Sequence, residues 1–271
     1  MIKHIANQTP IDGGIMMIWI LGLLATQALP LEPVGPWEVS TNRVGCQIVR
    51  VYGSDKPVQI GIKAKLTDKA RSVLVTGPKT FLPDGKGNIG VTLDGKESLQ
   101  INYGSFDVRD NRLRQLELFP SEAEFLRLAS STSITFGERF PPIHAGGIEA
   151  ALRALDTCTT DLLKSWGVDP ALYVGDKMAS FTGNPGEWFS YEDYPREALA
   201  KGISGRVTLL LKTKPDGSVD DCKAVVSDDS SLNVGSCALA KNIQFKPPLD
   251  AAGKAMASYA VLPIIWAMPN R

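Results

Sequence analysis

Few residues in this sequence have the types and spacing that could support catalysis or metal binding. The chain has two histidines, so a Ser-His-Asp triad or a histidine-based zinc site would have to use His144, in FPPIHAGG, or His4, near the N-terminus. No Gly-x-Ser-x-Gly sequence accompanies His144. We therefore interpret His144 as a solvated loop residue, and we expect a protein that is not an enzyme and has no metal and no cofactor.

Two further patterns resemble ligand-binding motifs but lack the required context. Residues Gly85–Gly90 match Gly-x-Gly-x-x-Gly, which binds dinucleotides when it follows a strand and opens a helix. Here VTLDG follows, which indicates a strand and a turn, so we interpret these glycines as part of a hairpin. Asp216, Asp220 and Asp221 lie close together, but their spacing differs from that of an EF-hand calcium loop. They are expected to be acidic residues of a turn.

The N-terminal residues 1–30 are predicted to direct export. The apolar run Ile15–Pro30 is too short for a comfortable membrane span. Thr26 and Ala28 supply residues of the kind that a signal peptidase reads, so we expect a signal peptide cleaved after Ala28. The alternative is that residues 15–30 form an uncleaved anchor in the inner membrane.

Export would place the four cysteines in an oxidising environment, where disulfides persist. Four cysteines allow three pairings, and no Cys-x-x-Cys spacing indicates a zinc ribbon or a redox site. Two cysteines fall in the front part of the chain and two in the back, so pairing within domains predicts Cys46–Cys158 and Cys222–Cys237. In a cytosolic protein the same residues would instead be buried thiols.

The length and charge of the chain limit its organisation and partners. Its 271 residues exceed what one small domain needs, so we expect two domains. Lys+Arg and Asp+Glu balance at 29 each. No general positive field therefore exists to attract nucleic acid, and we expect no nucleic-acid partner.

Residues 31–168 are predicted to form a mainly β domain, sandwich-like, with a long closing helix. The sequences CQIVRVYG, VQIGIKAKL, RSVLVTG, NIGVTLDG and SLQINYG are short runs of strand type, separated by turn signals. Such spacing predicts a sandwich or a half-barrel. Ser121 and Glu124 form a capping box before a short helix, and residues 147–166 have the apolar spacing of a longer one.

Residues 190–271 are predicted to form a small α+β domain, after a linker at residues 169–189 that has no strong hydrophobic period. The order is helix, strand, strand, helix, strand, with a three-stranded antiparallel sheet. The first helix begins at Tyr194-Pro195, and Pro215-Asp216-Gly217 turns the hairpin.

The later elements of this domain are predicted with specific inward residues. The return strand, residues 219–227, is expected to direct Cys222, Ala224 and Val226 into the core. A second helix over residues 232–243 is expected to be capped by Ser230 or Ser231 and to bury the apolar residues Val234, Ala238, Leu239 and Ile243.

The closing strand is predicted over Met256–Leu262. Pro263 follows, and proline cannot donate to a strand ladder. We therefore expect this strand to lie at an edge of the sheet or to end near Pro263.

Residues 190–268 resemble the C-terminal domain of TonB-family proteins. The residues that carry this resemblance are Tyr194-Pro195-x-x-Ala198, Gly202-x-x-Gly205-x-Val207, Pro215-Asp216-Gly217-x-Val219, Phe245-x-Pro247 and Gly253. Family members with a cysteine in the second strand and another in the following helix are similar to this chain at Cys222 and Cys237. Leu232-Asn233 departs from the Leu-Asp that the family usually has before its second helix.

The resemblance implies a role in energy transduction in the periplasm. TonB proteins carry work from an inner-membrane motor complex to outer-membrane transporters, and the domain captures the transporter's N-terminal peptide as an added strand. Strand addition uses unpaired backbone groups and needs no catalytic residue. The resemblance implies that the peptide binds along the closing strand, at Met256, Ala257, Ser258, Tyr259, Ala260, Val261 and Leu262.

Two alternatives follow from the front part of the chain. Family transducers have a firm membrane anchor and a long proline-rich spacer, whereas this chain has a predicted folded domain in place of the spacer. A soluble periplasmic binding or scaffold protein that reuses the module, with another envelope protein as its partner, is therefore the second hypothesis. An envelope enzyme with its active site in the front domain is the third.

Overall fold

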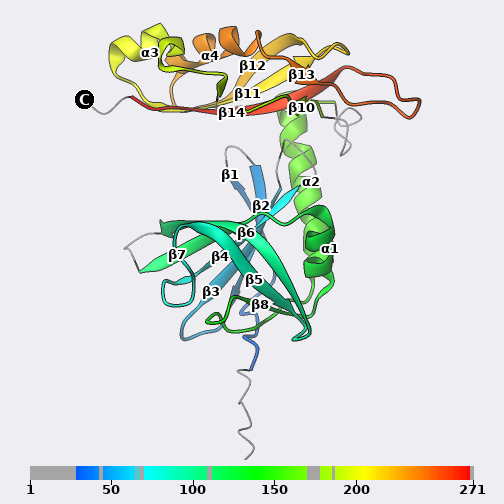
Figure 1. The fold of residues 1–271 in the computed structure, drawn as a ribbon. Helices are drawn as coiled ribbons and strands as arrows, with labels where there is room; N and C mark the ends of the chain where they lie inside the picture. The colour runs from blue at the N-terminus through cyan, green and yellow to red at the C-terminus, as the bar shows by residue number, and fades with distance from the viewer. Residues whose placement is uncertain are drawn as a thin grey trace, which may run out of the picture.

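The computed structural model describes residues 29–42, 45–64, 66, 70–108, 112–169, 178–184 and 187–268 (Figure 1). The predictions for the signal peptide or anchor at residues 1–28 lie outside these ranges. Within them, no helix combines the length and the apolar character that crossing a membrane requires.

The described N-terminal strands form one antiparallel sheet of nine strands, in the order β1-β2-β3-β4-β7-β6-β5-β8-β9. The glycine pattern at Gly85–Gly90 lies at the start of the β5–β6 hairpin, as expected. The bounds of the strands are β1 Glu38–Asn42, β2 Gly45–Tyr52, β3 Val58–Ala64, β4 Arg71–Pro78, β5 Lys86–Leu93, β6 Glu97–Val108, β7 Leu113–Leu118, β8 Ser133–Phe136 and β9 Ile143–His144.

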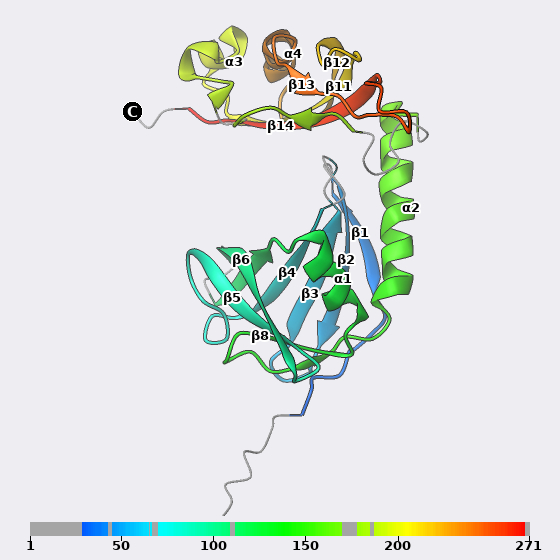
Figure 2. The same ribbon diagram turned by 45° about the vertical axis from the view of Figure 1, so that its right-hand side comes forward.

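This sheet curls until its two ends are linked through the segment at residues 31–34 (Figure 2). Leu31 bridges to Ile143 of β9, and Pro33 bridges to Tyr52 of β2. Of the two architectures that the sequence predicts, a sandwich or a half-barrel, the structure therefore has the single curled sheet. One continuous apolar core fills its concave side, with Ile48, Ile62, Val75, Ile101, Leu116 and Phe136 fully or almost fully buried.

Two helices accompany this sheet. Helix α1, Glu122–Ser130, begins with the predicted capping box between Ser121 and Glu124. Helix α2, Ile148–Trp166, ends at Gly167, which has a φ of 92° that favours glycine. The disulfide Cys46–Cys158 joins the middle of α2 to β2, and α2 then continues beyond the sheet towards the C-terminal domain (Figure 1).

The C-terminal domain has the predicted α+β architecture. Its antiparallel sheet has the order β12-β11-β14, and helices α3 and α4 cover one face of it (Figure 2). A two-stranded pairing of β10 with β13 lies beside this sheet. The bounds are β10 Ser180–Phe181, a 3-10 turn at Tyr191–Asp193, α3 Arg196–Lys201, β11 Gly205–Thr213, β12 Val219–Ser227, a second 3-10 turn at Ser230–Leu232, α4 Asn233–Ala240, β13 Phe245–Lys246 and β14 Ser258–Trp266.

Strand β12 departs from the predicted alternation. Cys222 and Ala224 pack on the helix-covered core as predicted, but Val226 packs on the opposite face. A bulge is the cause: Thr208 pairs with Val226 and Leu209 pairs with Ala224, so Val225 is the extra residue. An extra residue in one strand reverses the faces of every residue beyond it.

Helix α4 is shorter than predicted, and its predicted inward face is confirmed only in part, since Leu239 and Ile243 pack on the core. The 3-10 turn before it is capped by the carboxylate of Asp229, which accepts a 2.8 Å hydrogen bond from the Ser231 N–H, so neither Ser230 nor Ser231 is the cap. Val234 is 82 % exposed and Ala238 is exposed, in contrast to the prediction, whereas Ser236 and Ala240 are buried. The disulfide Cys222–Cys237 directs the face of α4 towards β12.

The closing strand also differs from its predicted bounds. Strand β14 begins at Ser258, so Met256 and Ala257 precede it, and it continues through Pro263 to Trp266. Thr208 of β11 lies opposite Pro263 in an unbroken register. A proline is accommodated when its missing N–H lies on the side of an edge strand that no neighbouring strand pairs with.

Much of the segment predicted as a linker packs on the C-terminal domain. Ala179 is buried in the domain core, and the rings of Phe181, Trp188 and Phe245 form a cluster with centroids 5.4 to 6.0 Å apart. The pairing of β10 with β13 continues this contact. Residues 170–177 of the predicted linker lie outside the described residues. We call residues 178–184 and 187–189 the strap.

Candidate functional site

Strand β14 is an edge of the C-terminal sheet. In the described part of the chain its single strand neighbour in that sheet is β11. Successive residues of an edge strand direct their backbone N–H and C=O groups alternately towards and away from the neighbour. The carbonyl of Tyr259 accepts a hydrogen bond from outside the sheet, which places Tyr259, Val261, Pro263 and Ile265 on the outward-directed set.

The two edges of this sheet differ in charge. Strand β14, SYAVLPIIW, has no charged residue. Strand β12 has Asp220, Asp221 and Lys223, and its disulfide attaches it to α4. Charged side chains protect an edge against the addition of a further strand. The edge at β14 is therefore the one that remains suited to strand addition.

The side of β14 that faces α3 and α4 anchors the strand. Ala260, Leu262, Ile264 and Trp266 alternate along β14 and are all buried in the domain core. Trp266 also stacks near Tyr194, with ring centroids 5.1 Å apart. Burying these four side chains fixes the position of the backbone whose outward groups form the edge.

The opposite face of the sheet is covered in part by the C-terminal end of α2. Leu163 and Trp166 of α2 are buried together with Leu210 of β11 and Val261 of β14. The Lys223 Nζ donates a 3.4 Å hydrogen bond to the carbonyl of Trp166. The front domain is thus in direct contact with the sheet that contains the candidate site.

The part of the sheet face that α2 covers does not extend to the C-terminal end of β14. Pro263 is exposed and Ile265 is 70 % exposed, on the same face as Val261. An exposed apolar residue beside an open edge offers a neighbour for the side chains of an added strand.

The residues of the family motif build the domain around β14. The Tyr194 hydroxyl donates a 2.7 Å hydrogen bond to the carbonyl of Ile203, and Pro195 lies so close to Gly235 that a Cβ there would be 2.8 Å from it. Ala198 is the fully buried residue of α3, and Gly202 ends that helix with a φ of 66°.

The remaining motif residues shape the hairpin and its surroundings. A Cβ on Gly205 would lie 3.0 Å from Leu232, and Val207 is fully buried. Gly217 has a φ of 85°. Pro247 and the turn at Gly253 lie in the loop that connects Phe245 to β14. Pro215, Asp216 and Val219 belong to the hairpin, where the Asp216 carboxylate accepts a 2.9 Å hydrogen bond from Ser218 N–H. None of the motif residues, from Tyr194 to Gly253, belongs to β14 itself.

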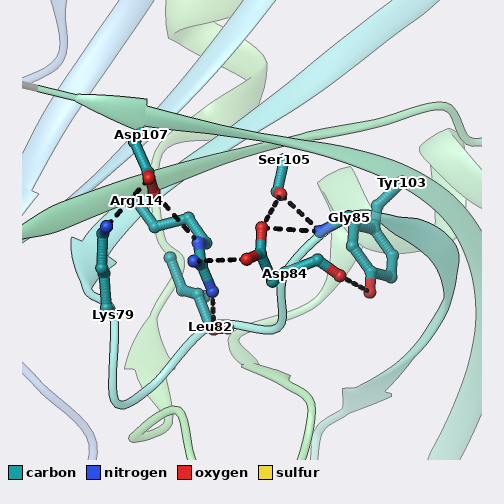
Figure 3. A network of polar contacts seen from close by, with 8 residues as sticks. All are labelled: Lys79, Leu82, Asp84, Gly85, Tyr103, Ser105, Asp107 and Arg114. Carbon is teal, nitrogen blue, oxygen red and sulfur yellow. Dashed lines mark hydrogen bonds and ion pairs between the residues drawn. The ribbon is translucent and has the colours of Figure 1, made fainter. Parts of the chain in front are cut away.

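The front domain contains a polar network that its sequence does not indicate, because its members are far apart in the chain (Figure 3). Arg114, almost fully buried, pairs with Asp84 at 3.0 Å and Asp107 at 3.4 Å and donates to the carbonyl of Leu82. A hydrogen bond from the Gly85 N–H, and to a smaller extent one from the Ser105 hydroxyl, lowers the pKa of Asp84. A hydrogen bond from Lys79 lowers the pKa of Asp107. Every charge in this network has an opposite partner, so we interpret it as structural.

The region around His144 forms an open cleft of about 600 Å³. His144 is exposed, as predicted, but it is the last residue of strand β9 and not part of a loop, because it pairs with Ser133 of β8. Its Nδ1 lies 3.2 Å from Glu32. Arg50 donates hydrogen bonds to the carbonyls of Gly35 and Gly146, at 2.7 and 2.8 Å, and its guanidinium lies 5.8 Å from the centre of the Trp37 ring. Arg50 thus ties the N-terminal segment to the start of α2. Within the described ranges, no group of three or more His, Cys, Asp or Glu residues is placed to hold a metal ion.

Comparison with known proteins places one part of the chain in a family. Residues 190–268 match the family model described as Gram-negative bacterial TonB protein C-terminal. A solved structure titled "Solution NMR structure of Pseudomonas aeruginosa TonB CTD" is 32 % identical and covers 29 % of this chain and 79 % of its own, with a TM-score of 0.24. No curated protein matches the chain.

Proposed function

Since residues 190–268 are a C-terminal domain of the TonB family, we propose that this protein binds an extended peptide of an envelope partner by strand addition at the outer edge of β14. The main support for this proposal is the open edge of the sheet at β14. Its outward-directed backbone groups lie on a strand without charges, and the other edge of the same sheet has three charged residues and a disulfide.

The partner that fits best is the N-terminal peptide of an outer-membrane transporter, and the function is energy transduction to that transporter. The family match supports this choice. The two disulfides support a location in the periplasm, where such bonds persist. Coupling to an inner-membrane motor complex completes the proposal.

A peptide array tests this function. Overlapping peptides that cover the N-terminal periplasmic segments of the organism's outer-membrane transporters are titrated against the full-length protein. We expect at least one segment to bind, with β14 amides gaining protection from hydrogen exchange. Val261→Pro removes an outward N–H, and Ala260→Pro removes one that pairs with β11. Val261→Pro should weaken binding several-fold while the melting temperature holds, whereas Ala260→Pro should lower the melting temperature. Binding that Val261→Pro leaves unchanged would refute strand addition at β14.

A second candidate function is a soluble periplasmic scaffold that reuses the TonB module. The observation that favours it is the contact between α2 and the C-terminal sheet, through Leu163, Trp166, Leu210 and Val261. A long, free spacer would let the module reach across the periplasm, whereas this contact holds it against the front domain. If no transporter segment binds but another envelope protein co-purifies through the β14 edge, the scaffold function replaces energy transduction. Both functions are binding functions, and we propose no catalytic role.

A further inference from the structure

The strap already pairs with one end of the β14 edge. The backbone N–H of Ala179 donates a 2.9 Å hydrogen bond to the carbonyl of Tyr259. Ala179 is 3 % exposed, so this bond is shielded from water. The strap lies before residue 190, and therefore outside the stretch that matches the TonB family.

Three further contacts hold the strap in this position. Ser180 and Phe181 pair with Lys246 and Phe245, and the Thr182 hydroxyl donates a hydrogen bond to the carbonyl of Gln244. At its far end the ring of Phe189 lies 5.8 Å from that of Trp266, the last residue of β14. The strap is thus attached near both ends of the edge strand.

In the described part of the chain, the middle of the edge has no such partner. Among the described residues, none outside β11 donates to or accepts from the backbone of Val261, Pro263 or Ile265. Val261 and Ile265 each offer an N–H and a C=O, and Pro263 offers a C=O alone. This part of β14 can pair with about five residues of an added strand.

We propose that the strap is a built-in stop on the docking edge, so that a partner peptide pairs with β14 only from Val261 to Ile265. The Ala179 N–H already donates to the Tyr259 carbonyl, which a longer peptide would need as an acceptor. The backbone pairing of the peptide therefore begins at Val261, the next outward-directed residue after Tyr259. This inference rests on the proposed function, because it assigns the register of the same peptide.

The same geometry indicates the side chains of the peptide. Residues directly opposite each other in a sheet share a face. Peptide residues opposite Pro263 and Ile265 would therefore lie beside these two exposed apolar side chains, on the face that α2 leaves open. A peptide with apolar residues at two positions separated by one residue fits this surface.

Hydrogen exchange on the wild-type, full-length protein tests the stop without any substitution. The probe is the transporter segment that binds in the peptide array. We expect the amides of Val261 and Ile265 to gain protection on binding, while the Ala179 amide stays protected and the Tyr259 amide stays unchanged. Loss of protection at Ala179 together with a gain at Tyr259 would show that the peptide displaces the strap, and would overturn the proposal.

Ala179→Pro provides a second test, because it removes the N–H that occupies Tyr259. The probes are two versions of the same segment, of about five and about nine residues. The longer peptide should bind the variant about threefold to tenfold more tightly than it binds wild type, because one further backbone hydrogen bond becomes available. The shorter peptide should be unaffected. Thr182→Val, which removes a strap contact away from β14, is the matched control and should change neither affinity.

Ile265→Asp tests the open part of the edge. It should weaken the binding of both peptides at least several-fold, whereas Val234→Asp, at an apolar residue of α4 that is also exposed, should not. Equal affinity of wild type and Ile265→Asp overturns the inference while leaving the proposed function in place. Absence of any binding to wild type overturns both.

Discussion

The indole Nε1 of Trp266 donates a 2.8 Å hydrogen bond to the Ser236 Oγ, and this bond joins the end of the edge strand β14 to the middle of helix α4. Ser236 in turn donates a 2.7 Å hydrogen bond to the carbonyl of Leu232. Both side chains are buried. The position of the candidate docking edge therefore depends on a polar contact inside the apolar core.

Ser236→Ala should lower the free energy of unfolding by about 1–3 kcal/mol, because it leaves the buried Trp266 N–H without its acceptor. Trp266→Phe removes the donor as well as part of the ring. In a double-mutant cycle by chemical denaturation, the two losses should add to more than the loss of the double variant, because they share one bond. Additive losses would contradict a hydrogen bond that contributes to stability.

Gly217→Ala should be more destabilising than Gly253→Ala. Both glycines have positive φ, 85° and 78°, so a left-handed penalty of about 1–2 kcal/mol applies to both. A Cβ on Gly217 would also overlap the carbonyl of Phe245, whereas nothing lies within 4 Å of one on Gly253. The Phe245 N–H donates to the Gly217 carbonyl at 2.9 Å, so the clash would disturb β13 and the strap. Thermal unfolding of both variants measures the difference, and equal melting temperatures would disprove it.

Replacement of Cys222 and Cys237 by serine should lower the stability of the C-terminal domain by about 3 kcal/mol, because the bond closes a loop of 15 residues in the unfolded chain. Replacement of Cys46 and Cys158 is the matched comparison and should act on the front domain, where the separation is 112 residues. Calorimetry of the two double variants separates the effects. Peptide mapping without reduction that finds a Cys46–Cys222 link, or four free thiols, would contradict both disulfides.

Asp94→Asn should change how stability depends on pH. The Asp94 carboxylate accepts hydrogen bonds that lower its pKa below the ordinary value of 3.8. The largest effect comes from the Thr132 hydroxyl, and smaller ones come from the N–H groups of Ser133 and Thr132. A lowered pKa stabilises the fold above the ordinary value, and this stabilisation is lost as the pH falls through the folded pKa. The advantage of wild type over Asp94→Asn should therefore be constant at neutral pH and shrink below 3.8.

Asparagine suits this test because it keeps an acceptor oxygen and tolerates the positive φ of 49° at residue 94. Melting temperatures of both proteins between neutral and acid pH give the comparison. Asp55→Asn is the control, since no described residue donates a hydrogen bond to Asp55. A difference between wild type and Asp94→Asn that does not vary with pH would show that the carboxylate charge is irrelevant.

The sequence by itself determined the features that depend on neighbouring residues. The capping box at Ser121 and Glu124 and the turn at Pro215-Asp216-Gly217 follow from local backbone chemistry, and both are present. The apolar spacing in α2 predicts its buried face for the same reason. The motif of the C-terminal domain could be read because its residues shape turns and close contacts at fixed spacing.

Only the tertiary structure decided how distant segments meet. A single extra residue at Val225 moves Val226 to the opposite face, and no local pattern reveals a bulge. The strap has no hydrophobic period, because its aromatic residues are held by Phe245 and Trp266 and not by a strand or helix of its own. Whether the β14 edge is open or covered depends on Ala179, some 80 residues away in the chain, and the cover on the adjoining face of the sheet depends on Trp166 of α2. Hydrogen bonds and burial between such segments are set by the packing of the whole chain, which local propensity does not encode.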